Sequence, residues 1–397
     1  MGNVPHLRFP EFTEEWKETK LGKIAEITKG SGISKDRLSE YGSPCILYGE
    51  LYTKYKSEII NEVYSRTELD SSLLVKSKAN DVIIPCSGET AIDISTARCV
   101  PFNNILLGGD LNIIRLKNND GGFFAYQLNG TRKKDIARVA QGVSVVHLYG
   151  ENLKHIRVYH PAIEEQKKIT RLLSLIDKRI ATQNKIIEDL KKLKCAIIEK
   201  VLNGNNANNL RLGDVGSYIR GLTYSSDDVV EYNSTLVMRS NNIVNGSLLD
   251  YQNNVVSVNK QISQEQQLQD GDIIICMANG SSALVGKSSF YDGKCISPIT
   301  VGAFCGIYRS KTAIAKWLFQ TNRYRRYIWN SLQGGNGAIA NLNSEDILRM
   351  SFPLPDKQTA ERCIKLLSSL ESLIESNISL CSKFSQQKEY LLRQMFI

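Results

Sequence analysis

The chain repeats itself, and this internal duplication limits the architectures that it can adopt. The segment LGKIA at residues 21–25 returns about 190 residues later as LGDVG at 212–216. The run DVII at 81–84 returns at the same spacing as DIII at 272–275. Both runs are short and apolar, and each follows a turn-prone residue, so they predict buried strands. Each half of the chain is therefore expected to contain one globular domain of related fold.

A proline-containing turn ends each half-domain and precedes a long helical pattern, at 160–166 and again at 352–358. The 397 residues allow two or three domains with real cores, and 42% hydrophobic with 23% charged residues is ordinary for a globular protein. The expected fold class is α+β, with two repeated α/β domains separated by two long helices. The expected order is a first domain (1–160), a first helix (161–203), a second domain (204–352) and a second helix (353–397).

The two halves differ most between these landmarks. Residues 31–78 and 222–268 cannot be aligned with each other by eye. A duplicated scaffold with two different inserts suggests two related folds that recognise two different things.

Both long helices carry apolar residues at heptad spacing, which predicts a coiled-coil seam. The seam residues expected to pack between helices or against partners are Ile169, Leu173, Ile176, Ile180, Gln183, Ile187 and Leu190 in the first helix, and Leu367, Leu370, Ile374, Asn377, Phe384 and Leu391 in the second. Polar residues interrupt the seam at matching positions, Gln183 and Lys194 in one helix and Asn377 and Lys388 in the other.

Matching polar interruptions are typical of positions that select register or partner. The two helices are thus expected to pair antiparallel within the chain, as a rod of about 55 Å that holds the domains apart. The alternative is that each helix packs on its own domain and exposes the interruptions to solvent.

The overall charge favours an anionic partner, since 50 Lys and Arg outnumber 41 Asp and Glu. Nine cysteines without any C-x-x-C pattern indicate reduced, mostly buried thiols rather than a disulfide framework or a zinc site. No apolar run approaches the ~18 residues of a membrane span, and no signal peptide is evident, so we expect a cytoplasmic protein with no membrane association.

No motif predicts chemistry in this chain. The segment from Gly280 to Ser288 resembles a nucleotide-binding P-loop, but five residues separate its glycines where four are needed, and a turn follows it instead of a helix. A P-loop ATPase remains an alternative that ATP turnover would reveal. The four histidines (His6, His147, His155 and His160) lack metal-ligand spacing. We predict no catalytic residue and no metal ligand.

An ordered set of motifs resembles a known family. The set comprises the opening PHLRFPEF at 5–12 with Trp16, the paired KLG and RLG starts at 20–22 and 211–213, the turn ending in Glu165-Gln166, and the two long helices. In this order they resemble the specificity subunits of type I restriction-modification systems, over the whole chain. One departure is that the second turn reads Asp356-Lys357-Gln358, which puts the equivalence of the two partner-docking surfaces in doubt.

The resemblance implies a non-catalytic subunit that reads double-stranded DNA. Each target recognition domain would read one half of a bipartite asymmetric site, and the helices would set the spacing. The implied partners are two DNA methyltransferase (modification) subunits and restriction/translocase subunits. S-adenosylmethionine, ATP and Mg²⁺ would be bound by those partners, and this chain would need no cofactor.

Basic residues that recur in both halves are the candidates for phosphate contacts. They are Lys29, Arg132, Lys133 and Lys134 in the first half, and Arg220, Arg323, Arg325 and Arg326 in the second. Lys29 and Arg220 each precede a glycine, which would let backbone approach a ligand closely. The alternative for each basic cluster is a solvated helix face.

Polar residues in loops after the matched strands are the candidates for contacts with base edges. They are Ser87, Thr90 and Ser144 in the first half, and Asn279, Ser281 and Asn336 in the second. Glycines beside them could simply make turns.

An alternative function from another class is a coiled-coil scaffold whose two domains bind proteins or RNA. Loss of a bipartite adenine-methylation motif from cells without the gene would separate a DNA reader from such a scaffold. A DNA reader of this kind is expected to bind DNA weakly alone and specifically only with the methyltransferase.

Overall fold

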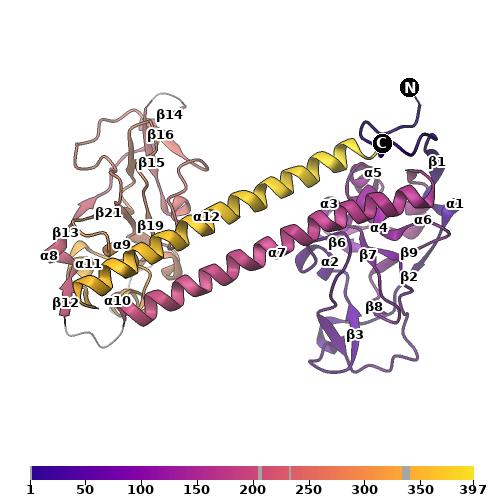
Figure 1. Cartoon of the computed structure of the whole chain (residues 1–397), viewed down its shortest axis with the longest axis horizontal. Coiled ribbons are helices and arrows are strands. Elements are labelled where there is room, and N and C mark those ends of the chain that lie inside the picture. Colours follow the sequence, from indigo (N-terminus) through magenta and orange to yellow (C-terminus); the bar gives the residue numbers. More distant parts are fainter. Residues whose placement is uncertain (1, 204–207, 232–233, 333–339) are drawn as a thin grey trace. The chain divides into compact units, whose positions relative to one another are not determined.

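The structure is a computed structural model that describes residues 2–203, 208–231, 234–332 and 340–397. It divides into two compact units: unit 1 is Met1–Lys185 with Ile378–Ile397, and unit 2 is Ile186–Asn377. The two long helices predicted from the heptads are present as α7 (Ile163–Leu202) and α12 (Lys357–Gln394), and each unit contains part of both (Figure 1).

Unit 1 is built on a four-stranded antiparallel sheet with the order β2-β9-β5-β7. These strands are β2 (Ala25–Lys29), β9 (Leu111–Leu116), β5 (Asp81–Pro85) and β7 (Arg98–Val100). A second sheet, β4-β3-β8, contains β4 (Ser65–Thr67), β3 (Ser43–Ile46) and β8 (Leu106–Leu107). Two smaller pairs join β1 (Lys17–Lys20) to β11 (Arg157–His160) and β6 (Ser87–Gly88) to β10 (Val146–His147).

Unit 2 repeats this plan. Its main sheet has the order β13-β21-β17-β19, formed by β13 (Gly216–Arg220), β21 (Cys305–Ser310), β17 (Ile273–Cys276) and β19 (Ser288–Phe290). Its second sheet, β14-β16-β15-β20, contains β14 (Val229–Val230), β16 (Val256–Val258), β15 (Thr235–Met238) and β20 (Ile299–Val301). The smaller pairs are β12 (Asn208–Arg211) with β23 (Ser351–Leu354) and β18 (Ala278–Asn279) with β22 (Ala340–Asn341).

Short helices connect the strands in both units. In unit 1 they are α1 (Leu21–Ile24), α2 (Glu50–Thr53), α3 (Ala91–Ile94), α4 (Gly121–Asn129), α5 (Lys133–Arg138), α6 (Gly150–Lys154) and the 3-10 turn η1 (Lys35–Arg37). In unit 2 they are α8 (Leu212–Val215), α9 (Ala315–Leu318), α10 (Asn322–Leu332), α11 (Ser344–Leu348), η2 (Ser226–Asp228), η3 (Ser240–Asn242) and η4 (Ser282–Leu284). The α+β class and the buried character of β5 and β17 are confirmed.

The inserts share a strand topology although their sequences cannot be aligned. In unit 1, β3 pairs antiparallel with β4 and parallel with β8. In unit 2, β15 pairs antiparallel with β16 and parallel with β20. The duplication therefore includes the inserts, and the difference between the halves lies in the side chains and loops that this common framework carries.

A buried ion pair marks the same place in both main sheets. Arg115 binds Asp81 through two hydrogen bonds of 2.9 and 2.7 Å, and Arg309 binds Asp272 through two of 2.8 and 2.7 Å. Both carboxylates are buried and also accept a backbone N–H three residues earlier in the chain. The repeated aspartate thus stabilises the beginning of β5 and of β17 through a bidentate ion pair with an arginine of the neighbouring strand.

A glycine after β2 and another after β13 allow two backbone segments to approach closely. A Cβ at Gly30 would lie 1.9 Å from the carbonyl oxygen of Gly108, and a Cβ at Gly221 would lie 2.2 Å from that of Gly302. At each place the space that a side chain would need is filled by the chain's own backbone, which accounts for the glycine without a ligand.

The C-terminus closes the core of unit 1. Phe396 packs edge-on against Trp16 and tilted against Phe123, with ring centroids 6.2 and 5.1 Å apart. The backbone N–H of Leu7 donates to the carbonyl of Gln394 at 2.9 Å. The last residues of the chain are therefore part of the first domain's core.

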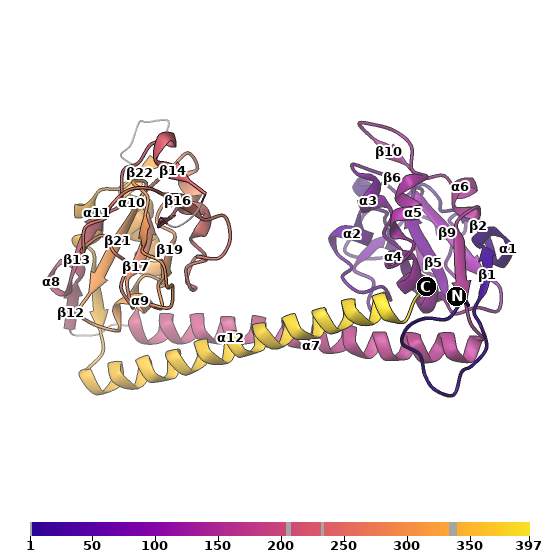
Figure 2. The same ribbon diagram turned by 90° about the horizontal axis from the view of Figure 1, so that it is seen from above.

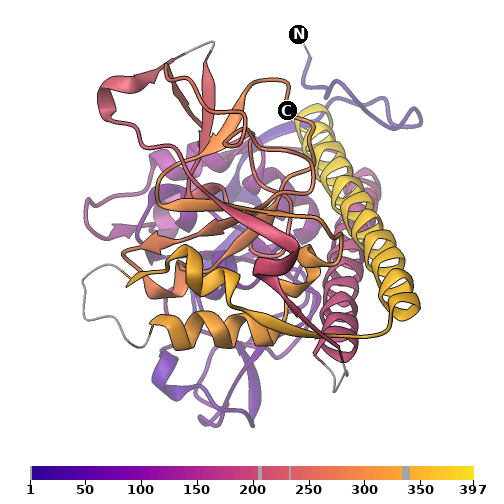
Figure 3. The same ribbon diagram turned by 90° about the vertical axis from the view of Figure 1, so that its left-hand side faces the viewer.

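The helices run antiparallel within each unit. In unit 1, Lys388 of α12 lies 2.6 Å from Asp177 of α7, while Cys381 contacts Asn184, so the contacts move in opposite directions along the two helices. In unit 2, Lys194 of α7 lies 3.2 Å from Glu371 of α12. Figure 2 shows both helices against one side of the domain in each unit, and Figure 3 looks onto unit 2.

Most of the predicted seam is buried. The buried members are Ile169, Leu173, Ile176, Gln183, Ile187, Leu367, Leu370, Ile374 and Leu391, and the partly buried members are Ile180, Leu190, Asn377 and Phe384. The interruptions Gln183 and Lys194 are buried and Lys388 is nearly so, which excludes the alternative that these positions face solvent. Among the described residues, no helix is both long and apolar enough to cross a bilayer.

Candidate nucleic-acid interface

In unit 1 the predicted polar residues gather around helix α3. Its contacts include β6, β10 and α5. Ser87 lies in β6, and Ser144 is exposed in the turn closed by two backbone hydrogen bonds between Gln141 and His147. Thr90 caps α3, since its hydroxyl oxygen accepts the backbone N–H of Asp93 at 3.1 Å. Segments distant in sequence thus present hydroxyl groups in one region of the domain.

The basic triplet of unit 1 is divided among three environments. Arg132 donates to the carbonyl oxygen of Ile397 at 2.6 Å and lies over the ring of Tyr159, so its charge serves to hold the C-terminus. Lys133 is half-buried, and burial, together with the nearby charge of Arg98, lowers its pKa. Lys134 is exposed on α5 and is the member best able to reach a phosphate.

Lys29 is exposed at the end of β2, close to the strand that leads into β6. Burial raises the pKa of the Cys86 thiol to about 11, and the charge of Lys29 opposes this effect. Because Cys86 directly precedes Ser87, the structure brings the Lys29 charge to the same region as the α3 cluster.

In unit 2 the corresponding region is formed by β18, η4 and α10. Asn279 accepts the backbone N–H of Ser281 at 3.0 Å and donates to Ser240 at 3.3 Å. A cleft of about 570 Å³ lies between the η4 loop and α10, and Ser282, Lys287 and Arg325 are among the residues that line it. Of the predicted residues of unit 2, Arg325 lines this cleft, whereas Asn279 and Ser281 precede the first loop residue that does, Ser282.

The other basic residues of unit 2 are placed differently. Arg323 is partly buried and donates to the side-chain oxygen of Asn203 at 3.2 Å. Arg326 is exposed on α10, and Arg220 is exposed at the end of β13. Asn336 lies outside the described residues.

A large cleft in unit 1 was not predicted from the sequence. It has a volume of about 1070 Å³ and lies between the β2–β3 connection, α2 and the β8–β9 turn, with Lys35, Tyr52, Lys54, Glu89 and Asp110 among its lining residues. All of these except Glu89 and Asp110 fall in the insert at 31–78, where no repeated motif could have identified them.

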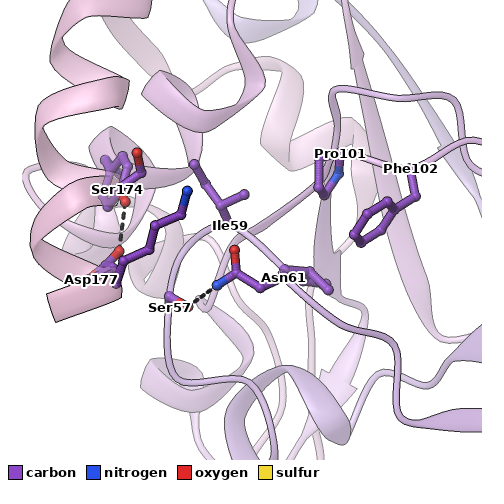
Figure 4. Close-up of a pocket in the computed structure, with 10 residues that line it drawn as sticks. Ser57, Ile59, Asn61, Pro101, Phe102, Ser174 and Asp177 are labelled. Atoms are coloured by element: carbon purple, nitrogen blue, oxygen red, sulfur yellow. Dashed lines mark hydrogen bonds between the residues drawn. The ribbon is translucent and has the colours of Figure 1, made fainter. Parts of the chain in front are cut away.

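A smaller cleft of about 360 Å³ separates α7 from the segment at 57–61 in unit 1. Figure 4 shows Ile59, Pro101 and Phe102 opposite Ser174 and Asp177 of α7. The carboxylate of Asp177 accepts a hydrogen bond of 2.6 Å from the buried hydroxyl of Tyr126. Burial raises the pKa of Asp177, while the charge of Lys388 opposes this effect.

No group of His, Cys, Asp and Glu able to hold a metal ion is present among the described residues. The sequence after Lys287 continues as strand β19, whereas a P-loop requires a helix there. Six of the nine cysteines are buried and all nine are free thiols, as expected.

Comparison with known proteins identifies both halves. Residues 13–192 and 205–380 each match the family model described as "Type I restriction modification DNA specificity domain". The two matched regions begin near the two copies of the repeat, so the duplication seen in the sequence is a duplication of this domain.

Several curated relatives carry the same designation. The specificity subunit of the EcoKI type I restriction enzyme from Escherichia coli is 29% identical over 171 residues, which cover 40% of this chain and 35% of that protein. A StySPI counterpart from Salmonella potsdam is 28% identical, again over 35% of its length, so the match spans about a third of these two relatives. A putative MjaX specificity subunit from Methanocaldococcus jannaschii is 23% identical over 94% of this chain and 91% of that protein.

Solved structures share the fold. The S subunit of a type I restriction-modification system from M. genitalium superposes with a TM-score of 0.65 over 99% of both chains at 14% identity. A chain from a study of complex assembly and conformational transition of the type I R-M system gives a TM-score of 0.53 at 14% identity, over 96% of this chain and 97% of that one. On the strength of the two family-model matches, this chain belongs to the type I restriction modification DNA specificity domain family, whose domain it contains twice.

Proposed function

We propose that this chain is the specificity subunit of a type I restriction-modification system, in which each unit's domain reads one half of a bipartite, asymmetric site on double-stranded DNA. The main observation in favour of the proposal is that both domains have the same strand framework but carry different residues in their loops. Both domains have the same sheet order and the same insert topology. The loops over this framework differ, as two readers of two different half-sites require.

Phosphate contacts in this proposal come from the exposed cations at corresponding places, Lys29 and Lys134 in unit 1 and Arg220, Arg325 and Arg326 in unit 2. Their exposure and the excess of basic residues support the assignment. Arg132, Lys133 and Arg323 are more enclosed and would act mainly by positioning their neighbours. Ser87, Ser144, Asn279 and Ser281 would supply hydrogen bonds to base edges.

The two long helices would set the distance between half-sites and dock the modification subunits, which the restriction/translocase subunits then join. The outer face of α12 supports docking, because Leu366, Leu373 and Leu380 form a heptad row outside the seam and are 48%, 48% and 41% exposed. Inserting one heptad into both helices lengthens each by about 10 Å, and the gap in the recognised site should grow by about three base pairs.

Catalysis in this proposal belongs to the partners, which would bind S-adenosylmethionine, ATP and Mg²⁺. The chain then contributes recognition alone. The domain-by-domain family match supports this division, since both halves are accounted for by specificity domains.

The test is a methylome comparison of host cells with and without the gene, sequenced so that methyladenine is detected directly. We expect a split adenine-methylation motif to disappear when the gene is removed and to return when it is restored. An unchanged methylome in cells that express the modification subunit would contradict the proposal.

A further inference from the structure

The cleft between η4 and α10 in unit 2 combines an aromatic surface with unpaired positive charge. Trp329 of α10 lines this cleft and is 65% exposed. The other two tryptophans of the chain, Trp16 and Trp317, are 2% and 0% exposed. Ile328, the neighbour of Trp329, lies in the core. One face of α10 therefore packs against the domain, and the indole of Trp329 lies on the exposed face.

The charges around this tryptophan are suited to a polyanion. Lys287 and Arg325 line the cleft, and Arg326 is exposed on the same helix. No ion pair joins any of these three cations to a carboxylate within the described residues. No Asp or Glu is among the residues that line the cleft, whereas the large cleft of unit 1 includes Glu50, Glu89 and Asp110.

The corresponding helix of unit 1 lacks these properties. α5 has the sequence KKDIAR and contains no aromatic residue. Its Asp135 pairs with Arg132 at 3.3 Å and with Arg138 at 3.0 Å. Helix α10, with the sequence NRYRRYIWNSL, has no acidic residue to neutralise its arginines. The exposed tryptophan is therefore specific to the second domain, and no carboxylate of α10 offsets its arginines as Asp135 does in α5.

We propose that Trp329 is a DNA-contacting residue of the second domain, whose indole packs against nucleotides of the second half-site while Arg325, Arg326 and Lys287 neutralise the phosphates beside it. The proposal rests on the function proposed above and assigns a residue to it. A flat, exposed aromatic side chain beside unpaired cations can pack against the sugars and thymine methyl groups of a duplex while the cations neutralise its phosphates. A partner protein would need carboxylates to match the same surface.

Because the other tryptophans are buried, the quenchable fluorescence of the full-length chain reports on Trp329. The experiment titrates the chain with a fluorescein-labelled random-sequence duplex at low salt, and measures fluorescein anisotropy and acrylamide quenching of tryptophan in the same samples. We expect the anisotropy to rise and the quenchable tryptophan fraction to fall together. Trp329→Ala removes the buried apolar area of the indole and should weaken binding about tenfold, and Trp329→Phe should restore most of it. Asn330→Ala, at an exposed neighbour that does not line the cleft, should change nothing.

The outcomes separate this inference from the function on which it rests. A rise in anisotropy with tryptophan still fully quenchable overturns the role of Trp329 and leaves the DNA-reading function standing. The absence of any DNA binding at low salt contradicts both. Loss of binding to the modification subunit by Trp329→Ala, with DNA binding unchanged, overturns the inference and assigns the cleft to a protein partner. Thermal unfolding of each variant shows that it is folded.

Discussion

Lys388 of α12 lies 2.6 Å from Asp177 of α7 and 2.5 Å from Glu58 of the first domain, and it joins the C-terminal end of one helix to the start of the other. Burial lowers the pKa of Lys388, but the charges of Glu58 and Asp177 outweigh burial and raise it. In unit 2 the counterpart is Lys194 with Glu371, which also binds Lys316 at 2.8 Å. The repeat thus places equivalent lysine–carboxylate pairs between the two helices in both units.

Removing Lys388 should destabilise unit 1. Lys388→Met leaves two enclosed carboxylates without their cation, and loss of one partner of a buried pair costs about 3 to 5 kcal/mol. Urea unfolding of the full chain measures the change. Lys383→Met is the matched control, because Lys383 is exposed on the same helix. Equal stability of the two variants would show that the ion pair contributes nothing.

Gly30 should not tolerate a side chain. Gly30→Ala forces a Cβ against the carbonyl oxygen of Gly108, and such overpacking costs about 1 to 3 kcal/mol or more. Gly32→Ala is the control, since nothing lies within 4 Å of a Cβ there. A melting temperature for Gly30→Ala as high as that of the control would contradict the close approach.

His160 should make the first domain sensitive to acid. Burial lowers its pKa from the ordinary value of 6.5, and the nearby charge of Lys17 lowers it further. The folded state therefore binds the proton of His160 less tightly than the unfolded state does. The domain keeps its full stability above pH 6.5 and loses part of it as the pH falls below that value. The counterpart in the second half is the buried Phe352. His160→Phe should remove this loss in melting curves between about pH 5 and 8; an unchanged pH profile would exclude His160 as its source.

The outer row of α12 should be needed for assembly and dispensable for folding. Leu373→Lys replaces an exposed apolar residue, so the melting temperature should stay within the error of the wild type. Association with the modification subunit, measured by co-purification or calorimetry, should weaken about tenfold or more. Leu370→Lys, at a buried seam position on the same helix, should instead lower stability. Unimpaired association of Leu373→Lys would place the docking surface elsewhere.

The sequence predicted those features that depend on periodicity or repetition. Heptad spacing located α7 and α12, and the repeated apolar runs located β5 and β17, because a buried strand or seam requires apolar residues at fixed intervals. The polar interruption at Lys388 was visible, but its partner Glu58 was not. That contact joins residues 330 positions apart, and no local pattern encodes it.

The candidate site was less predictable, because tertiary contacts give neighbouring cations different partners and different exposure. Arg132 and Lys134 are two residues apart, yet one holds the C-terminal carbonyl and the other faces solvent. Trp329 gave no signal in the sequence, since its exposure depends on which face of α10 packs on the core. The shared topology of the inserts was also hidden, because strand pairing can persist without recognisable sequence.

An exchange of the first recognition domain tests whether each domain reads its own half-site. Residues 20–150 are replaced by the equivalent domain of another family member, and the methylome of cells with the modification subunit is sequenced. We expect one half of the methylated site to change while the other half and the gap between them stay the same. A change in both halves, or in neither, would contradict the assignment of one half-site to each domain.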